Sequence, residues 1–224
     1  RDPQGKWYAL TRRARVPIVN PDIVDPASIK SYADLANPAL KGKLCLRNRK
    51  SPYNQSLVAD QIILRGEAAT AKWIRGMANN VSQEFFPKDT PQVQAVGKGK
   101  CGVAVVNTYY IGRMLAGRKG ADNKALAEKV KVVFPNPTHV NVSGAGVTAS
   151  SDNPKAALKL IEFLASPNAG KGYAAANLEF PVKGFGDNPI LRSWGTFKAD
   201  GVSVEQLGAK NKQAQALMEA NGWK

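Results

Sequence analysis

The feature that most constrains the fold of this chain is the apolar run at residues 101–107. It contains no polar side chain between Cys101 and Asn107. An uninterrupted run of this length is typical of a strand that is covered on both faces. Residues 108–113 follow without a break, and their pattern indicates a helix. This strand-to-helix passage, with the alternation of strands and helices elsewhere, predicts an α/β fold with a largely parallel sheet.

The remaining elements are predicted from periodicity and from capping residues. An extended segment covers residues 5–19, and further strands are expected at 43–47, 130–135 and 140–147. Helices are expected at 26–35, 54–64, 67–77, 89–96, 122–129, 154–165, 168–177, 204–207 and 212–221. Arg12 and Arg13 must point to opposite faces of the extended segment, because side chains alternate along a strand. We expect one of them to face a polar cleft.

Composition limits the classes of function. The chain has 224 residues and a formal net charge of +15. Such a charge fits a polyanion partner, but the basic residues are spread thinly and no nucleic-acid-binding motif is present. No apolar run is long enough to span a membrane, so stable insertion is not expected. The first five residues do not form a signal peptide. Motifs of serine hydrolases and of nucleotide-binding loops are absent, which argues against an enzyme of those classes.

Two cysteines and two tyrosines share one spacing. Cys45 lies in a predicted strand and Tyr53 follows eight residues later; Cys101 begins a strand and Tyr109 follows eight residues later. The cysteines fit either one disulfide bond or two buried thiols. If they pair, their strands are neighbours, and both tyrosines project from the same edge of the sheet. A disulfide closing this loop would contribute about 4 kcal/mol in the chain-entropy model.

Three phenols could therefore converge, because Tyr110 is adjacent to Tyr109. Fe(III) is a hard trivalent cation that favours anionic oxygen donors, whereas zinc and copper favour His or Cys. A bound cation of high charge deprotonates its ligands. Nearby arginines would stabilise phenolates. The alternative is that Tyr109 and Tyr110 are one core ring and one surface ring. The single histidine, His139, is interpreted as a structural residue.

The chain resembles the ferric-ion-binding proteins of bacterial iron ABC transporters, in particular the branch with a tyrosine-rich site. The resemblance rests on residues 7–16, 53–57, 107–113, 138–147 and 221–224. It implies a two-lobe fold of the periplasmic-binding-protein type II class, with crossing strands at a hinge. It further implies Fe(III) bound by Tyr53, Tyr109 and Tyr110, with Arg13 and Arg113 as supporting partners.

The resemblance also implies an organisation of the chain. Residues 1–19 would form a hinge-side strand region and 20–134 a second lobe with the tyrosine site. Residues 135–183 would return to the first lobe, and 184–224 would pack on the second lobe. Family members carry a preceding segment that supplies another ligand, and without it we expect an incomplete first lobe. Water or a synergistic anion would then fill the open iron positions.

The implied function is a monomeric, non-enzymatic, periplasmic solute-binding component that delivers Fe(III) to a membrane permease; the mature chain would carry no signal peptide. Two alternatives remain at this point. A protein of the same fold could bind an anion or a small organic molecule in a cleft rich in arginine. Less in keeping with the sequence, the chain could be a basic nucleic-acid-binding protein.

Overall fold

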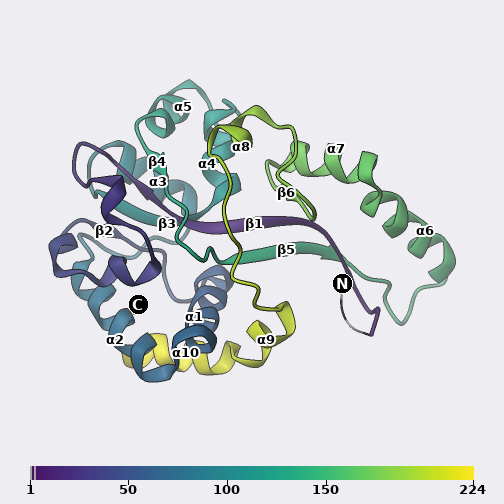
Figure 1. Cartoon of the computed structure of the whole chain (residues 1–224), viewed down its shortest axis with the longest axis horizontal. Helices are drawn as coiled ribbons and strands as arrows, with labels where there is room; N and C mark the ends of the chain where they lie inside the picture. Colours follow the sequence, from purple (N-terminus) through teal and green to yellow (C-terminus); the bar gives the residue numbers. More distant parts are fainter. Residues whose placement is uncertain (1, 3) are drawn as a thin grey trace. The chain divides into compact units, whose positions relative to one another are not determined.

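A twelve-residue strand, β1 (Tyr8–Val19), runs through both structural units of the protein. The computed structural model describes residue 2 and residues 4–224. Unit 1 comprises Arg1–Ala14 and Val140–Thr196, and unit 2 comprises Arg15–His139 and Phe197–Lys224. The chain thus passes between the units three times, after residues 14, 139 and 196. Figure 1 traces the order of the elements along the sequence.

The two halves of β1 have different partners. In unit 1, β1 pairs with β5 (Val140–Ala145) and β6 (Phe180–Pro181). In unit 2, its second half pairs with β3 (Val103–Asn107) and β4 (Lys131–Val132). All four pairings are antiparallel.

The expectation of a largely parallel sheet is therefore wrong for these strands. The parallel pair of named strands is β2 (Leu44–Cys45) with β3, where Cys45 lies opposite Ala104. That pair does place the two cysteine-containing segments side by side, and Cys45 and Cys101 form a disulfide bond. The sequence pattern shows that a strand is buried, but it carries no signal for the direction of a partner far away in the chain.

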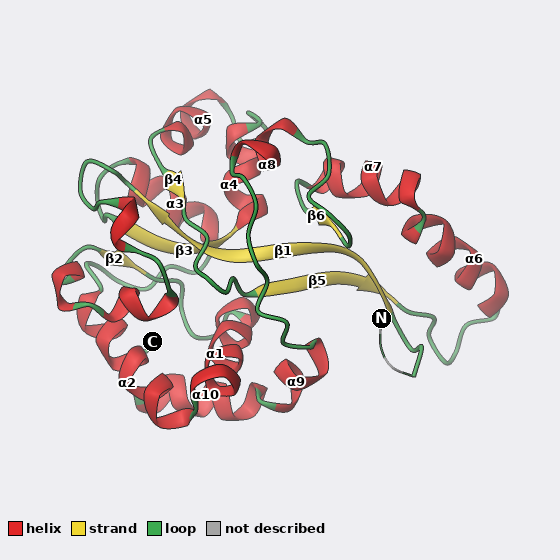
Figure 2. Cartoon of the chain, in the orientation of Figure 1, coloured by secondary structure: helices red, strands yellow, loops and turns green. Residues whose placement is uncertain are grey.

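Helices cover both faces of the β2–β3 pair in unit 2 (Figure 2). The helices of this unit are α1 (Pro52–Arg65), α2 (Glu67–Asn80), α3 (Asp89–Gly97), α4 (Thr108–Leu115), α5 (Ala121–Glu128), α9 (Val204–Ala209) and α10 (Asn211–Ala220). Every residue of β3 is buried, as the apolar run predicts. The core includes Leu57, Ile74 and Met77, and the rings of Trp73 and Trp223 meet edge to face at 6.4 Å.

The predicted helix at residues 26–35 is replaced by short 3-10 turns. These are Pro26–Ser28, Tyr32–Ala36 and Pro38–Leu40. Ile29 and Ser31 both have an extended backbone, which interrupts the expected helix, and Asp25 and Asn37 cap the turns that follow them by accepting a hydrogen bond from the backbone two residues on. This segment still buries Tyr32 and Leu35.

Unit 1 adds three helices, α6 (Pro154–Ala165), α7 (Pro167–Asn177) and α8 (Pro189–Ser193). Ser166 separates α6 from α7 and accepts a hydrogen bond from the amide of Ala169. Gly146 is required by packing, because a Cβ there would approach the Lys6 carbonyl oxygen to 2.5 Å. Phe180 is fully buried, whereas Leu160 and Phe163 of α6 are 58% and 64% exposed.

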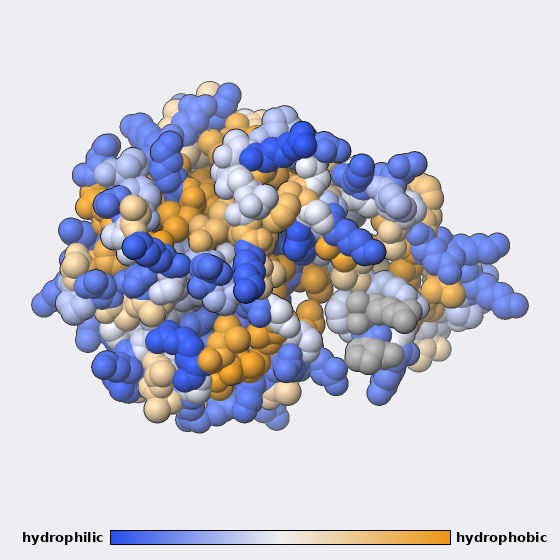
Figure 3. Space-filling model, viewed as in Figure 1, coloured by the Kyte–Doolittle hydropathy of each residue, from blue (hydrophilic) through white to orange (hydrophobic). Residues whose placement is uncertain are grey.

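The surface and the helix lengths agree with the composition. On the face of unit 2 shown in Figure 3, hydrophilic residues predominate and a smaller apolar area lies near α1 and α9. Among the described residues, no helix has the length and apolar character needed to cross a membrane.

Candidate functional site

Two tyrosines lie where the buried strand β3 gives way to α4. Asn107 ends the strand with an extended backbone, and Thr108 begins the helix. Tyr109 and Tyr110 thus occupy the first turn of α4, with their ring centroids 4.4 Å apart and their planes at 31°. Tyr109 is buried and Tyr110 is partly exposed. The pair therefore presents neighbouring phenols at a helix N-terminus, a position that favours negative charge.

The third predicted tyrosine joins them from another helix. Tyr53 lies in the first turn of α1, directly after Pro52, which begins that helix. The Tyr109 hydroxyl donates a hydrogen bond to the Tyr53 hydroxyl at 3.2 Å. The structure therefore brings the three predicted phenols together within unit 2, and we refer to Tyr53, Tyr109 and Tyr110 as the tyrosine cluster.

Arginines surround this cluster. Arg113 lies 4.9 Å from the centroid of the Tyr109 ring, one turn further along α4. Arg47 and Arg15 lie 5.3 Å and 5.8 Å from the centroid of the Tyr53 ring. Their positive charges would stabilise a phenolate next to them. Of the two arginines predicted from the sequence, Arg113 contacts the cluster, while Arg13 belongs to unit 1 and donates a hydrogen bond to Ser143.

Asp89 holds the two arginines that sequence reasoning missed. Its carboxylate is fully buried and pairs with Arg15 at 3.0 Å and with Arg47 at 3.1 Å. It also accepts a hydrogen bond from the backbone N–H of Asn107, the residue that precedes α4. Arg15 additionally binds the Asn54 side chain, next to Tyr53. The only sequence signal was Asp89 at a helix start, and its arginine partners lie far away in the chain.

The Tyr109 phenol is held in its neutral form. Burial raises the pKa of Tyr109, and hydrogen bonds with Tyr110 and Tyr53 raise it further. The Tyr109 proton therefore stays in place at neutral pH until a cation displaces it. Hard, highly charged cations do this most effectively, and their binding releases protons. The chemistry of the donors thus fits a trivalent metal ion with affinity for phenolate oxygen.

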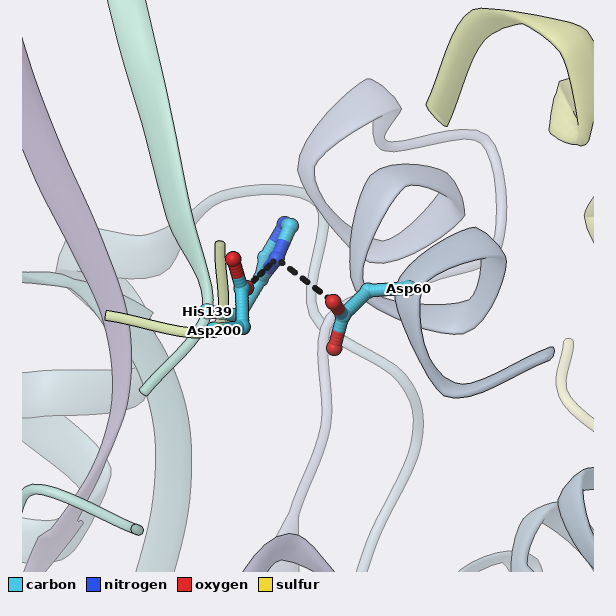
Figure 4. Close-up of side chains that lie close together, drawn as sticks. All are labelled: Asp60, His139 and Asp200. Atoms are coloured by element: carbon cyan, nitrogen blue, oxygen red, sulfur yellow. Dashed lines mark hydrogen bonds and ion pairs between the residues drawn. The ribbon is translucent and has the colours of Figure 1, made fainter. Parts of the chain in front are cut away.

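A second cluster contains the histidine. Asp60, His139 and Asp200 place one ligand-type atom each within 4.8 Å of one another (Figure 4). His139 Nδ1 lies 2.9 Å from an Asp200 oxygen and 3.7 Å from an Asp60 oxygen, and Nε2 lies 3.0 Å from the Ser56 hydroxyl. The three side chains are almost completely buried. The imidazole already has a partner at each ring nitrogen, which fits the structural role predicted for His139.

Two α/β units joined by three chain crossings, with ligand-type side chains at helix N-termini, define the class of type II periplasmic binding proteins. Residues 1–201 match the family model of bacterial extracellular solute-binding proteins. The chain belongs to this family.

Individual relatives support this family assignment. Iron uptake protein A1 of Synechocystis is 41% identical over the whole chain, and the major ferric iron-binding protein of Neisseria meningitidis is 29% identical over 97% of it. The chain spans 63% and 65% of those two proteins. A solved Trichodesmium structure, described as in complex with iron and citrate, superposes with a TM-score of 0.95 at 36% identity, covering the whole chain and 72% of that protein.

Proposed function

We propose that this protein is a ferric-iron solute-binding protein that holds Fe(III) through the phenolates of Tyr53, Tyr109 and Tyr110. The observation that carries the proposal is the convergence of three phenols from two helix N-termini, linked by the Tyr109–Tyr53 hydrogen bond. Three phenolates would balance the charge of the ion, and the neighbouring arginines would offset the remaining negative charge. The names of the relatives support the same ion.

The proposal also covers the groups that support the bound ion, the delivery of the ion and the location of the protein. Arg113 stabilises the phenolate of Tyr109, and Arg13 is the second supporting arginine that the resemblance implies. An anion such as citrate, which the Trichodesmium structure contains, or water completes the coordination. The protein binds and releases its ion without chemical conversion and delivers it to an ABC-transporter permease. The Cys45–Cys101 disulfide supports a periplasmic location, because such bonds persist in oxidising compartments.

A colour test addresses the site directly. Loading the protein with ferric citrate should produce a visible phenolate-to-iron charge-transfer band. Tyr109→Phe should weaken iron binding by more than the roughly 10–100-fold that loss of a supporting partner costs. Tyr173→Phe is the matched control, because Tyr173 lies in α7 of unit 1 and is partly exposed. A loaded protein without the band, or equal losses in both variants, would refute the proposal.

The fold also admits a second kind of ligand. A spermidine/putrescine-binding periplasmic protein of Escherichia coli is 28% identical over 71% of this chain. Titration calorimetry with a polyamine, with phosphate and with simple carboxylates, all without iron, separates this alternative from ferric binding. The arginines around the tyrosine cluster favour anions over polyamines.

A further inference from the structure

The chain leaves and enters unit 2 through three segments, which hydrogen bonds link to one another. The first begins at Arg15 and the second ends at His139, each the residue next to a crossing. The Arg15 amide donates to the His139 carbonyl at 3.1 Å. The His139 amide donates to the Tyr32 hydroxyl at 2.9 Å, and that hydroxyl donates to the Arg15 carbonyl at 2.6 Å. Tyr32 thus bridges the first two segments.

The third segment, beginning at Phe197, is tied to the second in the same way. The Thr138 amide donates to the Lys198 carbonyl at 2.8 Å, and the Asp200 amide donates to the Thr138 carbonyl at 3.0 Å. The Asp200 carboxylate then reaches the imidazole of His139 at 2.9 Å. His139 and Asp200 therefore each use both backbone and side chain to join the segments, and His139 contacts both of the others.

The imidazole also ties these segments to the helix that carries a proposed iron ligand. Ser56 of α1 lies 3.0 Å from Nε2 of the ring. Asp60 of the same helix lies 3.7 Å from Nδ1 (Figure 4). Tyr53, Ser56 and Asp60 are spaced at i, i+3 and i+7, which places them on one face of the helix. The segments that cross between the units and Tyr53 are thus connected through one short stretch of α1.

The groups that face His139 bear charges that suit an imidazolium. Burial opposes its charged form, but hydrogen bonds and charge attraction from Asp200 and Asp60 outweigh this, so the pKa of His139 is raised. The pKa of Asp200 is lowered, because its bond to His139 outweighs its burial. Tyr32, beside the His139 amide, remains neutral because burial raises its pKa. The Arg15 carbonyl accepts a hydrogen bond from the same Tyr32 hydroxyl, and the Arg15 guanidinium pairs with Asp89.

We propose that His139, charged and paired with Asp60 and Asp200, is a positioning residue that fastens the three crossing segments to α1 and thereby sets how firmly the tyrosine cluster retains its metal ion. The consequence for iron rests on the proposed function. The fastening itself is a property of the iron-free protein and is tested there first.

The ionisation of His139 can be followed without assignment work, because the sequence contains one histidine. Proton NMR of the iron-free protein should give a single imidazole titration with a midpoint above the ordinary value of about 6.5. Asp200→Asn should move that midpoint downward, whereas Asp122→Asn, an exposed residue of α5, should leave it unchanged. A midpoint at or below the ordinary value, or one insensitive to Asp200→Asn, would overturn the proposal.

Hydrogen exchange tests the fastening. In His139→Gln, and in Asp200→Asn if the first variant does not fold, the amide of Arg15 should exchange faster than in the parent protein. Amides in the middle of α2, away from the cluster, should keep their rates. Exchange at Arg15 that matches the parent in a folded variant contradicts the proposal, whatever the outcome of any iron experiment.

Iron release then tests the functional link. After ferric citrate loading, the rate of transfer to a competing chelator should rise about 10-fold in Asp200→Asn, the lower end of the effect of supporting partners. The charge-transfer band should keep its position, because the phenolate ligands are unchanged. An unchanged release rate would overturn the positioning role. A parent protein that takes up no iron would refute the proposed function instead, while the titration and exchange results would still decide the fastening.

Discussion

The tyrosine cluster and the His139 cluster both belong to unit 2. They differ in how far hydrogen bonds and charge pairs within the cluster meet the needs of its own polar groups. The tyrosine cluster combines a Tyr109 phenol that burial keeps neutral with arginines at the rings of Tyr53 and Tyr109, and a bound cation would turn its hydroxyls into strong ligands. The His139 cluster is almost completely buried, and its imidazole already lies between two carboxylates. A ligand-binding site keeps donor groups that a ligand can use, whereas the groups of a structural cluster pair with one another on folding.

Removing the charge that supports the tyrosine cluster should have the largest effect on folding. Asp89→Asn leaves Arg15 and Arg47 without their common carboxylate. Breaking a buried pair of this kind costs about 3–5 kcal/mol of unfolding free energy. Urea denaturation measures it, with Asp122→Asn as an exposed control within about 0.5 kcal/mol of the parent. A loss no larger than that of the control would show that Asp89 does not anchor this region.

Removing the imidazole should cost less, because a neutral amide can replace part of its bonding. His139→Gln leaves two buried carboxylates facing each other without an intervening cation. An unsatisfied buried group costs about 1–3 kcal/mol, and the same urea experiment should report a loss in this range. Adding Asp60→Asn to His139→Gln should recover part of the loss. No recovery would mean that repulsion between the carboxylates is not its source.

The pH dependence of stability should separate the two clusters further. Because the folded-state pKa of His139 is raised, its contribution is fully present below the unfolded value of about 6.5 and is lost as pH rises through the folded value. The difference in unfolding free energy between the parent and His139→Gln should therefore shrink from about pH 6 to about pH 9. Thermal or urea unfolding across this range measures it. A difference that grows with pH would reverse the assigned sign.

The smallest effect on folding is expected where the effect on binding is largest. Tyr109→Phe removes one neutral hydroxyl, which donates a hydrogen bond to the Tyr53 hydroxyl. The net contribution of such a bond is about 0.5–1.5 kcal/mol, so the iron-free variant should remain close to the parent in urea. Its charge-transfer band on iron loading should nevertheless be strongly reduced. A large loss of stability would show that Tyr109 mainly stabilises the core, and it would count against the role of Tyr109 as a ligand.

Several local features followed from the sequence. The apolar run at residues 101–107 predicted a fully buried strand, and Asp89 lies at the helix start that local capping rules favour. The helix expected from residue 54 begins two residues earlier, at Pro52. The matched spacing of Cys45 to Tyr53 and of Cys101 to Tyr109 anticipated neighbouring strands, which the parallel β2–β3 pair confirms. The resemblance in five short segments anticipated the family, which the match over residues 1–201 confirms.

Other features required partners that lie far apart along the chain. Arg15 and Arg47 lie at the Tyr53 ring because both bind Asp89. The spacing of these residues in the sequence does not predict that they meet. The same holds for His139, whose carboxylate partners lie 79 positions before it and 61 after it. The antiparallel pairing of β1 was missed for this reason too, since burial patterns do not encode strand direction.

The sequence by itself determined which segments are buried, where helices begin and which three phenols were candidates for a metal site. These properties depend on local periodicity and on short-range backbone hydrogen bonds, which neighbouring residues control. Only the tertiary structure decided that Tyr109 and Tyr53 touch, that arginines lie at their rings and that one histidine joins three crossing segments. Those properties depend on charges and hydrogen bonds between residues that folding alone brings together.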